Sequence, residues 1–170
     1  SSQATGEKSS AFGWNSCATG CKSTASGAYS CALEDFSSAF GVAARALEYM
    51  SQAFGRASCA TARCSTASGF YSCATAISAS AFGKHSCATG TWATASGYKA
   101  KATGNGSTAS GYISEATGVY SNAFGSKICA TGTNATVVGF CSCATGAYSQ
   151  VLGRTSCAIS NYGTAIGFCT

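Results

Sequence analysis

Proline is absent from this chain of 170 residues, and charged residues make up only 9% of it. Disordered chains are normally rich in both, so the low complexity of the sequence does not indicate disorder. No stretch approaches the 18 apolar residues of a membrane-spanning helix, so we expect no membrane insertion in this segment. The ten Lys and Arg residues are scattered, which argues against a nucleic-acid partner.

Histidine is nearly absent as well, since His85 is the only one. Glu34, Asp35 and Glu48 gather on one corner of the repeat and are interpreted as a small acidic surface patch. No nucleophile stands at a useful spacing from a base, so no catalytic constellation can be assembled. We therefore predict a protein that is not an enzyme and holds no cofactor. The chain starts at Ser1 without a signal-peptide pattern, and we expect a processed form or an excerpt of a longer array.

What the sequence does have is a repeat of seven residues, x-x-S-x-A-x-G. Counted in sevens from Gly6 to Gly167, here called the lattice positions, 19 of 24 are Gly, and the residue two before each is Ala or Val. Ser, Ala and Gly recur at the strand spacing of two, which predicts a short strand in each unit and a corner after it. The most constant positions are too small for a heptad coiled coil, so residues 42–53, helical in isolation, are assigned to the same array.

A doubled period sets the size of each coil. Lattice positions preceded mostly by Thr (Thr-type corners) alternate with those preceded mostly by Phe or Ser (Phe-type corners). All five lattice positions without Gly are Thr-type, so the Phe-type corner is the one that demands a positive φ or close backbone approach. We predict an all-β parallel β-solenoid of 14-residue coils with two short strands each, about 12 coils in a single uninterrupted array over residues 1–170. Ala, Ser and Gly should line its thin interior, and all large side chains should point outward.

The outward columns are the candidate functional residues. The aromatic face consists of Phe12, Phe40, Phe54, Phe82 and Phe124. The Cys column consists of Cys17, Cys31, Cys59, Cys73, Cys87, Cys129, Cys143 and Cys157. The Thr column beside it consists of Thr19, Thr61, Thr75, Thr89, Thr103, Thr117, Thr131 and Thr145. Rows of Phe and Cys on a surface are typical of an interface, so at least one face should be covered by another chain.

The Cys column has three possible roles. Stacked coils hold in-register side chains about 4.8 Å apart, farther than the Cβ separation of about 3.8 Å in a disulfide, so staples between coils would be strained. Reduced thiols acting as small apolar interface residues, or bridging to a partner chain, are favoured. Metal binding is disfavoured because no C-x-x-C or His partner is present. The corner residues Cys21, Cys64, Cys141 and Cys169 are better candidates for covalent bridges, and twelve Cys point to an oxidising compartment.

Strings such as SSAFG (9–13), STASG (23–27), SCATG (16–20) and the closing TAIG (164–167) resemble the Hep/Hag-type repeats of YadA-like heads in trimeric autotransporter adhesins. The resemblance implies a left-handed parallel β-roll that forms a trimer on a cell surface and binds host or other cell-surface ligands. It also implies that the Cys-Ala-Thr strands pack nearest the trimer axis. The richness in Cys and the missing neck, stalk and anchor segments depart from that family.

We therefore predict a structural or adhesive extracellular fibre or filament subunit, a homo-oligomer that assembles laterally and, because both ends fall in mid-repeat, end to end. The alternative is an ice-binding solenoid that uses the Cys-x-Thr face. Against this alternative, Arg45, Lys101 and Glu115 interrupt the Cys column, and ice binding requires clean, regular columns.

Overall fold

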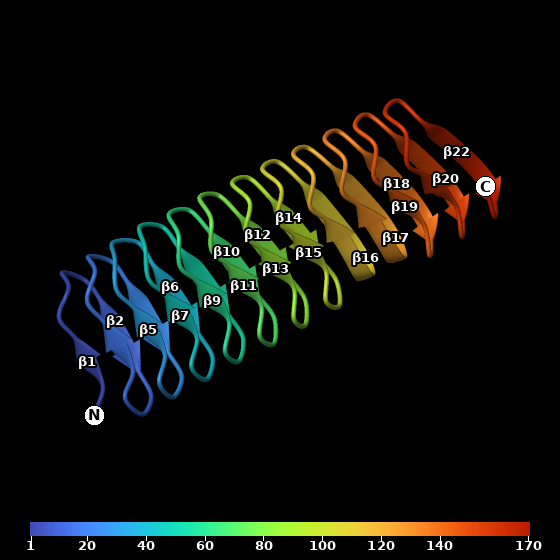
Figure 1. Cartoon of the computed structure of the whole chain (residues 1–170). Coiled ribbons are helices and arrows are strands. Elements are labelled where there is room, and N and C mark those ends of the chain that lie inside the picture. Colours follow the sequence, from blue (N-terminus) through green and yellow to red (C-terminus); the bar gives the residue numbers. More distant parts are fainter. The chain divides into compact units, whose positions relative to one another are not determined.

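The computed structural model of the chain describes all residues from Ser1 to Thr170 and contains only strands, turns and bends. The chain winds into a parallel β-solenoid of about 12 coils with about 14 residues in each (Figure 1), which confirms the predicted fold class. None of its segments is a helix of the length and apolar character needed to cross a membrane. The chain divides into two compact units, Ser1–His85 and Ser86–Thr170, called here the first and the second unit.

In the first unit each coil contributes one strand of two residues and one of three. The two-residue strands are β1 (Gln3–Ala4), β3 (Cys17–Ala18), β5 (Cys31–Ala32), β7 (Arg45–Ala46), β9 (Cys59–Ala60) and β11 (Cys73–Ala74). The three-residue strands are β2 (Ser10–Phe12), β4 (Thr24–Ser26), β6 (Ser38–Phe40), β8 (Gln52–Phe54), β10 (Thr66–Ser68) and β12 (Ser80–Phe82). The segment 42–53 forms β7 and most of β8, so its assignment to the array is confirmed.

The second unit repeats this plan with longer strands toward its end. Its strands are β13 (Cys87–Ala88), β14 (Thr94–Ser96), β15 (Lys101–Ala102), β16 (Thr108–Ala116), β17 (Asn122–Ala130), β18 (Thr136–Phe140), β19 (Cys143–Ala144), β20 (Gln150–Arg154), β21 (Cys157–Ala158) and β22 (Thr164–Phe168). Strands β16 and β17 continue through a Phe-type corner and so take part in both layers of the coil.

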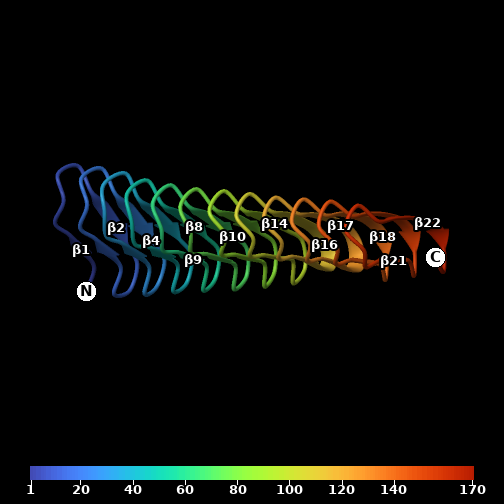
Figure 2. The ribbon, with the colours of Figure 1, turned by 45° about the horizontal axis from the view of Figure 1, so that its top comes forward.

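Neighbouring coils pair in parallel with a constant offset of 14 residues. Cys17 lies beside Cys31 and Ala18 beside Ala32 in the first unit, and Cys129 lies beside Cys143 in the second. The Cys17 amide donates to the Ser30 carbonyl at 2.9 Å, and similar bonds recur from coil to coil. Because these bonds hold neighbouring coils in a constant register, equivalent residues form columns within each unit. Figure 2 shows the successive coils of the backbone stacked in this way.

The interior is as thin as the sequence predicts. Its apolar part is almost entirely alanine, nearly all with no exposed area, and Ile128, Val137 and Val151 are the only larger apolar side chains fully buried there. No aromatic residue is buried. Serines four residues before the lattice positions fill the rest, and most donate a hydrogen bond to the carbonyl of the preceding lattice residue, as Ser23 does to Gly20 at 2.7 Å.

The corners use a left-handed backbone at every coil. The second residue after each lattice position has φ between +51° and +59°, or +65° at Gly106, and the next amide donates back to the lattice carbonyl in many corners, as Ser9 does to Gly6 at 3.1 Å. A left-handed third residue with this bond is typical of a type II turn. At the twelve Phe-type corners the lattice glycine itself also has φ between +110° and +147°, which explains why only these corners never accept another residue.

Candidate interaction faces

The Cys column lies on the two-residue strands of each unit, beside the corner that follows the three-residue strands. From coil to coil the first unit reads Gln3, Cys17, Cys31, Arg45, Cys59 and Cys73, and the second unit reads Cys87, Lys101, Glu115, Cys129, Cys143 and Cys157. All twelve cysteines are thiols. Those of the Cys column are half-buried, apart from the exposed Cys157. The predicted column therefore exists as an outward row in each unit.

Charges within the column give the thiols different acidities. A hydrogen bond with Cys73, helped by the positive charge of Arg45, lowers the pKa of the Cys59 thiol to about 6. On the other side of Arg45, burial raises the pKa of Cys31, and the neighbouring Cys17 adds to this effect. Cys59 is thus more easily converted to a thiolate than Cys31.

The second unit has the opposite electrostatics. Burial and the negative charge of Glu115 raise the pKa of Cys129, and burial between Cys129 and Cys157 raises the pKa of Cys143 to about 11. Lys101 bonds to Glu115 at 2.9 Å, and this contact raises the pKa of Lys101. Cys129 and Cys143 therefore stay protonated at neutral pH.

An open groove runs along the Cys column in each unit. In the first unit it encloses about 600 Å³ and includes Cys17, Cys31, Arg45 and Cys59. Tyr29 and Tyr71 stand along its corner side, and the small Ala43 and Ala57 lie between them in the same column. In the second unit a groove of about 430 Å³ is lined by Lys99, Lys101, Ile113, Ser114, Glu115, Lys127, Ile128 and Cys129.

The Thr column lies at the surface beside the Cys column, as exposed or half-exposed side chains. Two of its hydroxyl groups bond to the backbone of the next coil: Thr19 donates to the Leu33 carbonyl at 2.8 Å and Thr131 to the Ala144 carbonyl at 3.5 Å. Leucines occupy this slot at positions 33 and 47. The column is therefore neither continuous nor entirely available to water.

The aromatic face lies on the opposite layer, formed by the three-residue strands. Phe40 and Phe54 stack with their ring centres 5.5 Å apart. Phe54 is half-exposed, and the other four rings are exposed: Phe12, Phe40, Phe82 and Phe124. In the second unit the same slot continues with Phe124, Val138, Leu152 and Ile166 on four consecutive coils, all of them exposed.

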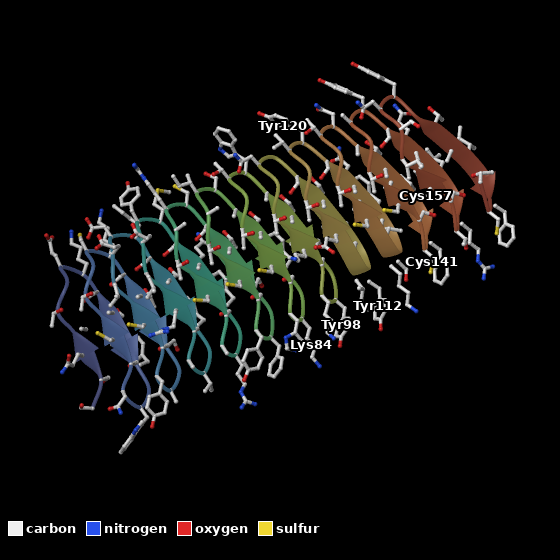
Figure 3. The ribbon with its side chains drawn as sticks, in the orientation of Figure 1. Lys84, Tyr98, Tyr112, Tyr120, Cys141 and Cys157 are labelled. Carbon is white, nitrogen blue, oxygen red and sulfur yellow. The ribbon has the colours of Figure 1, made fainter.

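The corners carry ladders of rings and cations. Tyr98 stacks on Tyr112 at 5.3 Å and Tyr148 on Tyr162 at 5.1 Å; Figure 3 shows Tyr98 and Tyr112 leaving one corner and Tyr120 the opposite one. Arg154 lies between two rings of its column, 5.4 Å from Phe140 and 5.6 Å from Phe168. Each such cation–π contact is worth roughly 0.5–1 kcal/mol at an exposed site, so the corners add stability between coils.

The remaining predicted residues lie at corners. Cys64, Cys141 and Cys169 are exposed, and Cys21 is half-buried. His85 is exposed and stacks on Tyr71 with ring centres 5.5 Å apart. No group of three or more His, Cys, Asp or Glu side chains is arranged to hold a metal ion.

Sequence reasoning missed one recurring contact. An Asp or Asn directly after a Thr-type lattice position accepts a hydrogen bond from the equivalent amide one coil earlier, as Asp35 does from Cys21 at 2.7 Å and Asn161 from Ala147 at 3.0 Å. Asn105 does the same for Thr91 at 3.2 Å. Asp35 is therefore a backbone partner as well as a surface charge. The sequence feature that could have revealed this contact is the recurrence of Asp or Asn directly after Thr-type lattice positions, 14 residues from the amide that donates.

Comparison with known proteins agrees with the repeat. The family model of the YadA head domain repeat matches residues 1–16, 88–112 and 102–127. The last two matches begin one coil apart, since 102 − 88 = 14. No curated protein matches the chain. Repeats of this family form surface-exposed adhesin domains. Over these residues, which are about a third of the chain, the cysteine-rich sequence therefore carries YadA-like head repeats.

Proposed function

We propose that the chain is a subunit of an adhesive or structural fibre at the cell surface, and that it assembles side by side with copies of itself through the aromatic face. The observation that carries this proposal is the exposed apolar slot on four consecutive coils of the second unit, where Phe124 is 41% exposed and Leu152 46%. A regular apolar surface in water is typical of an interface.

A second copy is the occupant that suits this surface best. Its own column repeats at the same spacing of about 4.8 Å per coil, so its side chains can match those of the first copy coil for coil. Most assemblies of soluble proteins are symmetric homo-oligomers, in which one surface serves every subunit. A trimer and a filament are both compatible with such a face, whereas the trimer that the resemblance implies would pack through the Cys-Ala-Thr strands of the opposite layer.

Serine replacements test the assembly without disturbing the fold. Ser26 and Ser68 occupy the aromatic slot naturally in the first unit, as Ser96 and Ser110 do in the second. We expect Val138→Ser/Leu152→Ser to keep the circular dichroism of the wild type and to sediment as a smaller species. A wild type that stays monomeric at all concentrations would refute the proposal.

The matched control lies on the opposite face. Cys129→Ser/Cys143→Ser also replaces two adjacent outward residues, in a column that already accepts Arg45, Lys101 and Glu115. We expect it to leave the sedimentation unchanged. If it dissociates the assembly while the Val138→Ser/Leu152→Ser variant does not, the Cys-Ala-Thr strands are the assembly face. End-to-end stacking is tested by electron microscopy at increasing concentration, and adhesion by binding of the assembled protein to cells and matrix proteins.

Ice binding is the second candidate, supported by the outward Thr of most coils. Ordered water needs regular columns, and in this protein charged and leucine side chains break them. We expect no thermal hysteresis from the purified protein. Clear hysteresis that is lost in Thr89→Leu would instead establish the Cys-x-Thr face as an ice-binding surface.

A further inference from the structure

Two pairs of thiols flank a single arginine on the Cys column of the first unit. Cys17 pairs in register with Cys31, Cys31 with Arg45, Arg45 with Cys59, and Cys59 with Cys73. The two cysteines of each pair occupy the same slot on adjacent coils. All four are half-buried, and the groove of the first unit opens onto three of them.

The geometry points to a metal site of an unusual kind: we propose that Cys17–Cys31 and Cys59–Cys73 are two-coordinate sites for a soft monovalent metal ion, Cu⁺ or Ag⁺. Thiolates select soft ions, and monovalent ions of this type form linear complexes with two sulfurs. The sequence disfavours metal binding because it has no C-x-x-C motif or His partner, but a two-coordinate site needs neither.

The coil spacing fits such a bridge better than it fits a disulfide. Two metal–sulfur bonds of about 2.3 Å each, placed in line, span about 4.6 Å. Side chains in register on adjacent parallel strands stand about 4.8 Å apart. A disulfide needs Cβ atoms about 3.8 Å apart, so the backbone would have to move to form one, whereas a linear sulfur–metal–sulfur bridge needs little movement.

Charge favours the first unit. When two thiols bind one monovalent ion, two protons leave and the resulting thiolate–metal–thiolate unit carries one negative charge. The oxidation states of metal and sulfur do not change. Arg45 lies next to both pairs, and its guanidinium balances the charge of one occupied site. The second ion to bind meets no such compensation, so it should bind more weakly than the first.

The second unit supplies an internal control with the same spacing and the opposite charge. Cys129 and Cys143 pair in register, but the neighbour of Cys129 is Glu115. The nearby Lys101 is bonded to that carboxylate at 2.9 Å. A negative metal–thiolate unit at Cys129–Cys143 would therefore stand beside a carboxylate, and one at Cys143–Cys157 would have no cation in the neighbouring slots of the column. Both pairs should bind after the two pairs of the first unit.

The test uses the whole chain, reduced and freed of metal under anaerobic conditions, and titrated with Cu⁺ against a competing Cu⁺ chelator. Native mass spectrometry should show two tightly bound ions in the wild type. Cys73→Ser and Cys31→Ser should each retain one tight ion, and Cys31→Ser/Cys73→Ser should retain none, because this variant keeps no two cysteines 14 residues apart between Cys17 and Cys87. Serine preserves the size of the side chain, and the column already accepts polar residues, so these variants should fold.

Two further variants separate this proposal from binding by thiols in general. Cys129→Ser/Cys143→Ser should keep both tight ions, and Arg45→Gln should weaken the first ion about threefold, the effect of removing one exposed charge partner. Tight binding that survives in Cys31→Ser/Cys73→Ser, the absence of tight binding in the wild type, or a Cys59–Cys73 disulfide in the native protein by non-reducing peptide mapping would each overturn the proposal.

Discussion

At the scale of single residues, the inward serines differ in one respect that the sequence does not reveal. Ser121 donates from Oγ to the Gly118 carbonyl at 2.7 Å, whereas the buried hydroxyl groups of Ser107 and Ser114 have no hydrogen-bond partner. All three belong to the second unit and occupy equivalent slots of the repeat. Alanine is also native to this slot, as at Ala93 and Ala100. The same substitution can therefore be compared in two environments.

We predict opposite effects of serine-to-alanine changes at these positions. Ser121→Ala should lower the free energy of unfolding by about 1 kcal/mol, the net value of a buried hydrogen bond. Ser107→Ala should leave it unchanged or raise it, because a buried hydroxyl without a partner is itself unfavourable. Denaturant unfolding followed by circular dichroism measures both. Equal losses in the two variants would show that the Ser107 hydroxyl is bonded in solution.

The thiols differ at the same scale in their response to pH. The pKa of Cys59 falls from 9.0 to about 6, so its contribution to stability is present above pH 9 and is lost as the pH falls through 6. The pKa of Cys143 rises from 9.0 to about 11, so its contribution is present below pH 9 and is lost as the pH rises through 11.

Alkylation of the metal-free protein should reveal this difference. We expect the rate of iodoacetamide labelling to reach half its maximum near pH 6 at Cys59 and near pH 11 at Cys143, because the thiolate is the reacting form. Peptide mapping by mass spectrometry gives each rate separately. Arg45→Gln should shift the Cys59 midpoint upward and leave that of Cys143 in place. A common midpoint for both cysteines would contradict the assigned environments.

At the scale of strands and corners, the two corner types should tolerate substitution differently. Gly27, at a Phe-type corner, has φ of +125°, and an added Cβ would clash with the Gly41 carbonyl oxygen. Gly20, at a Thr-type corner, lies even closer to the next coil, where an added Cβ would clash with the Glu34 carbonyl group, but its φ is not positive. Glu34, Glu48, Ala62 and Ala76 show that the backbone of such corners accommodates a side chain.

We therefore predict that Gly27→Ala lowers the free energy of unfolding by about 2 kcal/mol or more, since a strained backbone residue costs roughly 1–3 kcal/mol. Gly20→Ala should lower it by less than half as much. Thermal unfolding of the two variants side by side provides the measurement. A larger loss in Gly20→Ala would mean that the contact with the next coil, rather than backbone strain, decides which corners keep glycine.

The strict corner was predictable because glycine never varies there, and the strands were predictable because Ser, Ala and Gly alternate. The left-handed residue two positions after every lattice position was not. Asn15, Gly106 and Asn134 are residue types that favour this backbone, but Lys22, Phe36 and Trp92 adopt it too. Coil stacking outweighs their local preference, so the signal is absent from composition. The Cys column was predicted as a row, but the separate acidities of its thiols depend on neighbours one coil away.

At the scale of the whole molecule, the repeat passes from the first unit to the second without insertion, since Gly83, Gly90 and Gly97 keep the lattice. This continuity is the ground for proposing that residues 1–170 form one uninterrupted array. In a repeat array stability is carried mainly by contacts between adjacent coils, so we expect a single calorimetric transition for the chain. Two well-separated transitions would show that the units fold independently.

Deletions of different length test whether the coil, rather than the seven-residue unit, is the building block. Removing residues 98–111 takes out one full coil of the second unit and brings together coils with matching faces. We expect this variant to remain a folded β-protein with slightly reduced thermal stability. Removing residues 98–104 takes out seven residues and exchanges Thr-type and Phe-type corners in all later coils.

In that shorter deletion Cys129 and Cys143 would move onto the layer of the aromatic face. At the junction Gly97 and Gly111, which have large positive φ, would stack on the Thr-type corners at Gly118 and Gly90, whose backbone differs. The Gly, Ala and Ser positions of the repeat would stay in register, so if the seven-residue unit were the building block this deletion would not destabilise the protein. We expect instead loss of the cooperative transition or aggregation, measured by circular dichroism and light scattering. Equal stability of the two variants would refute the 14-residue coil as the unit of this fold.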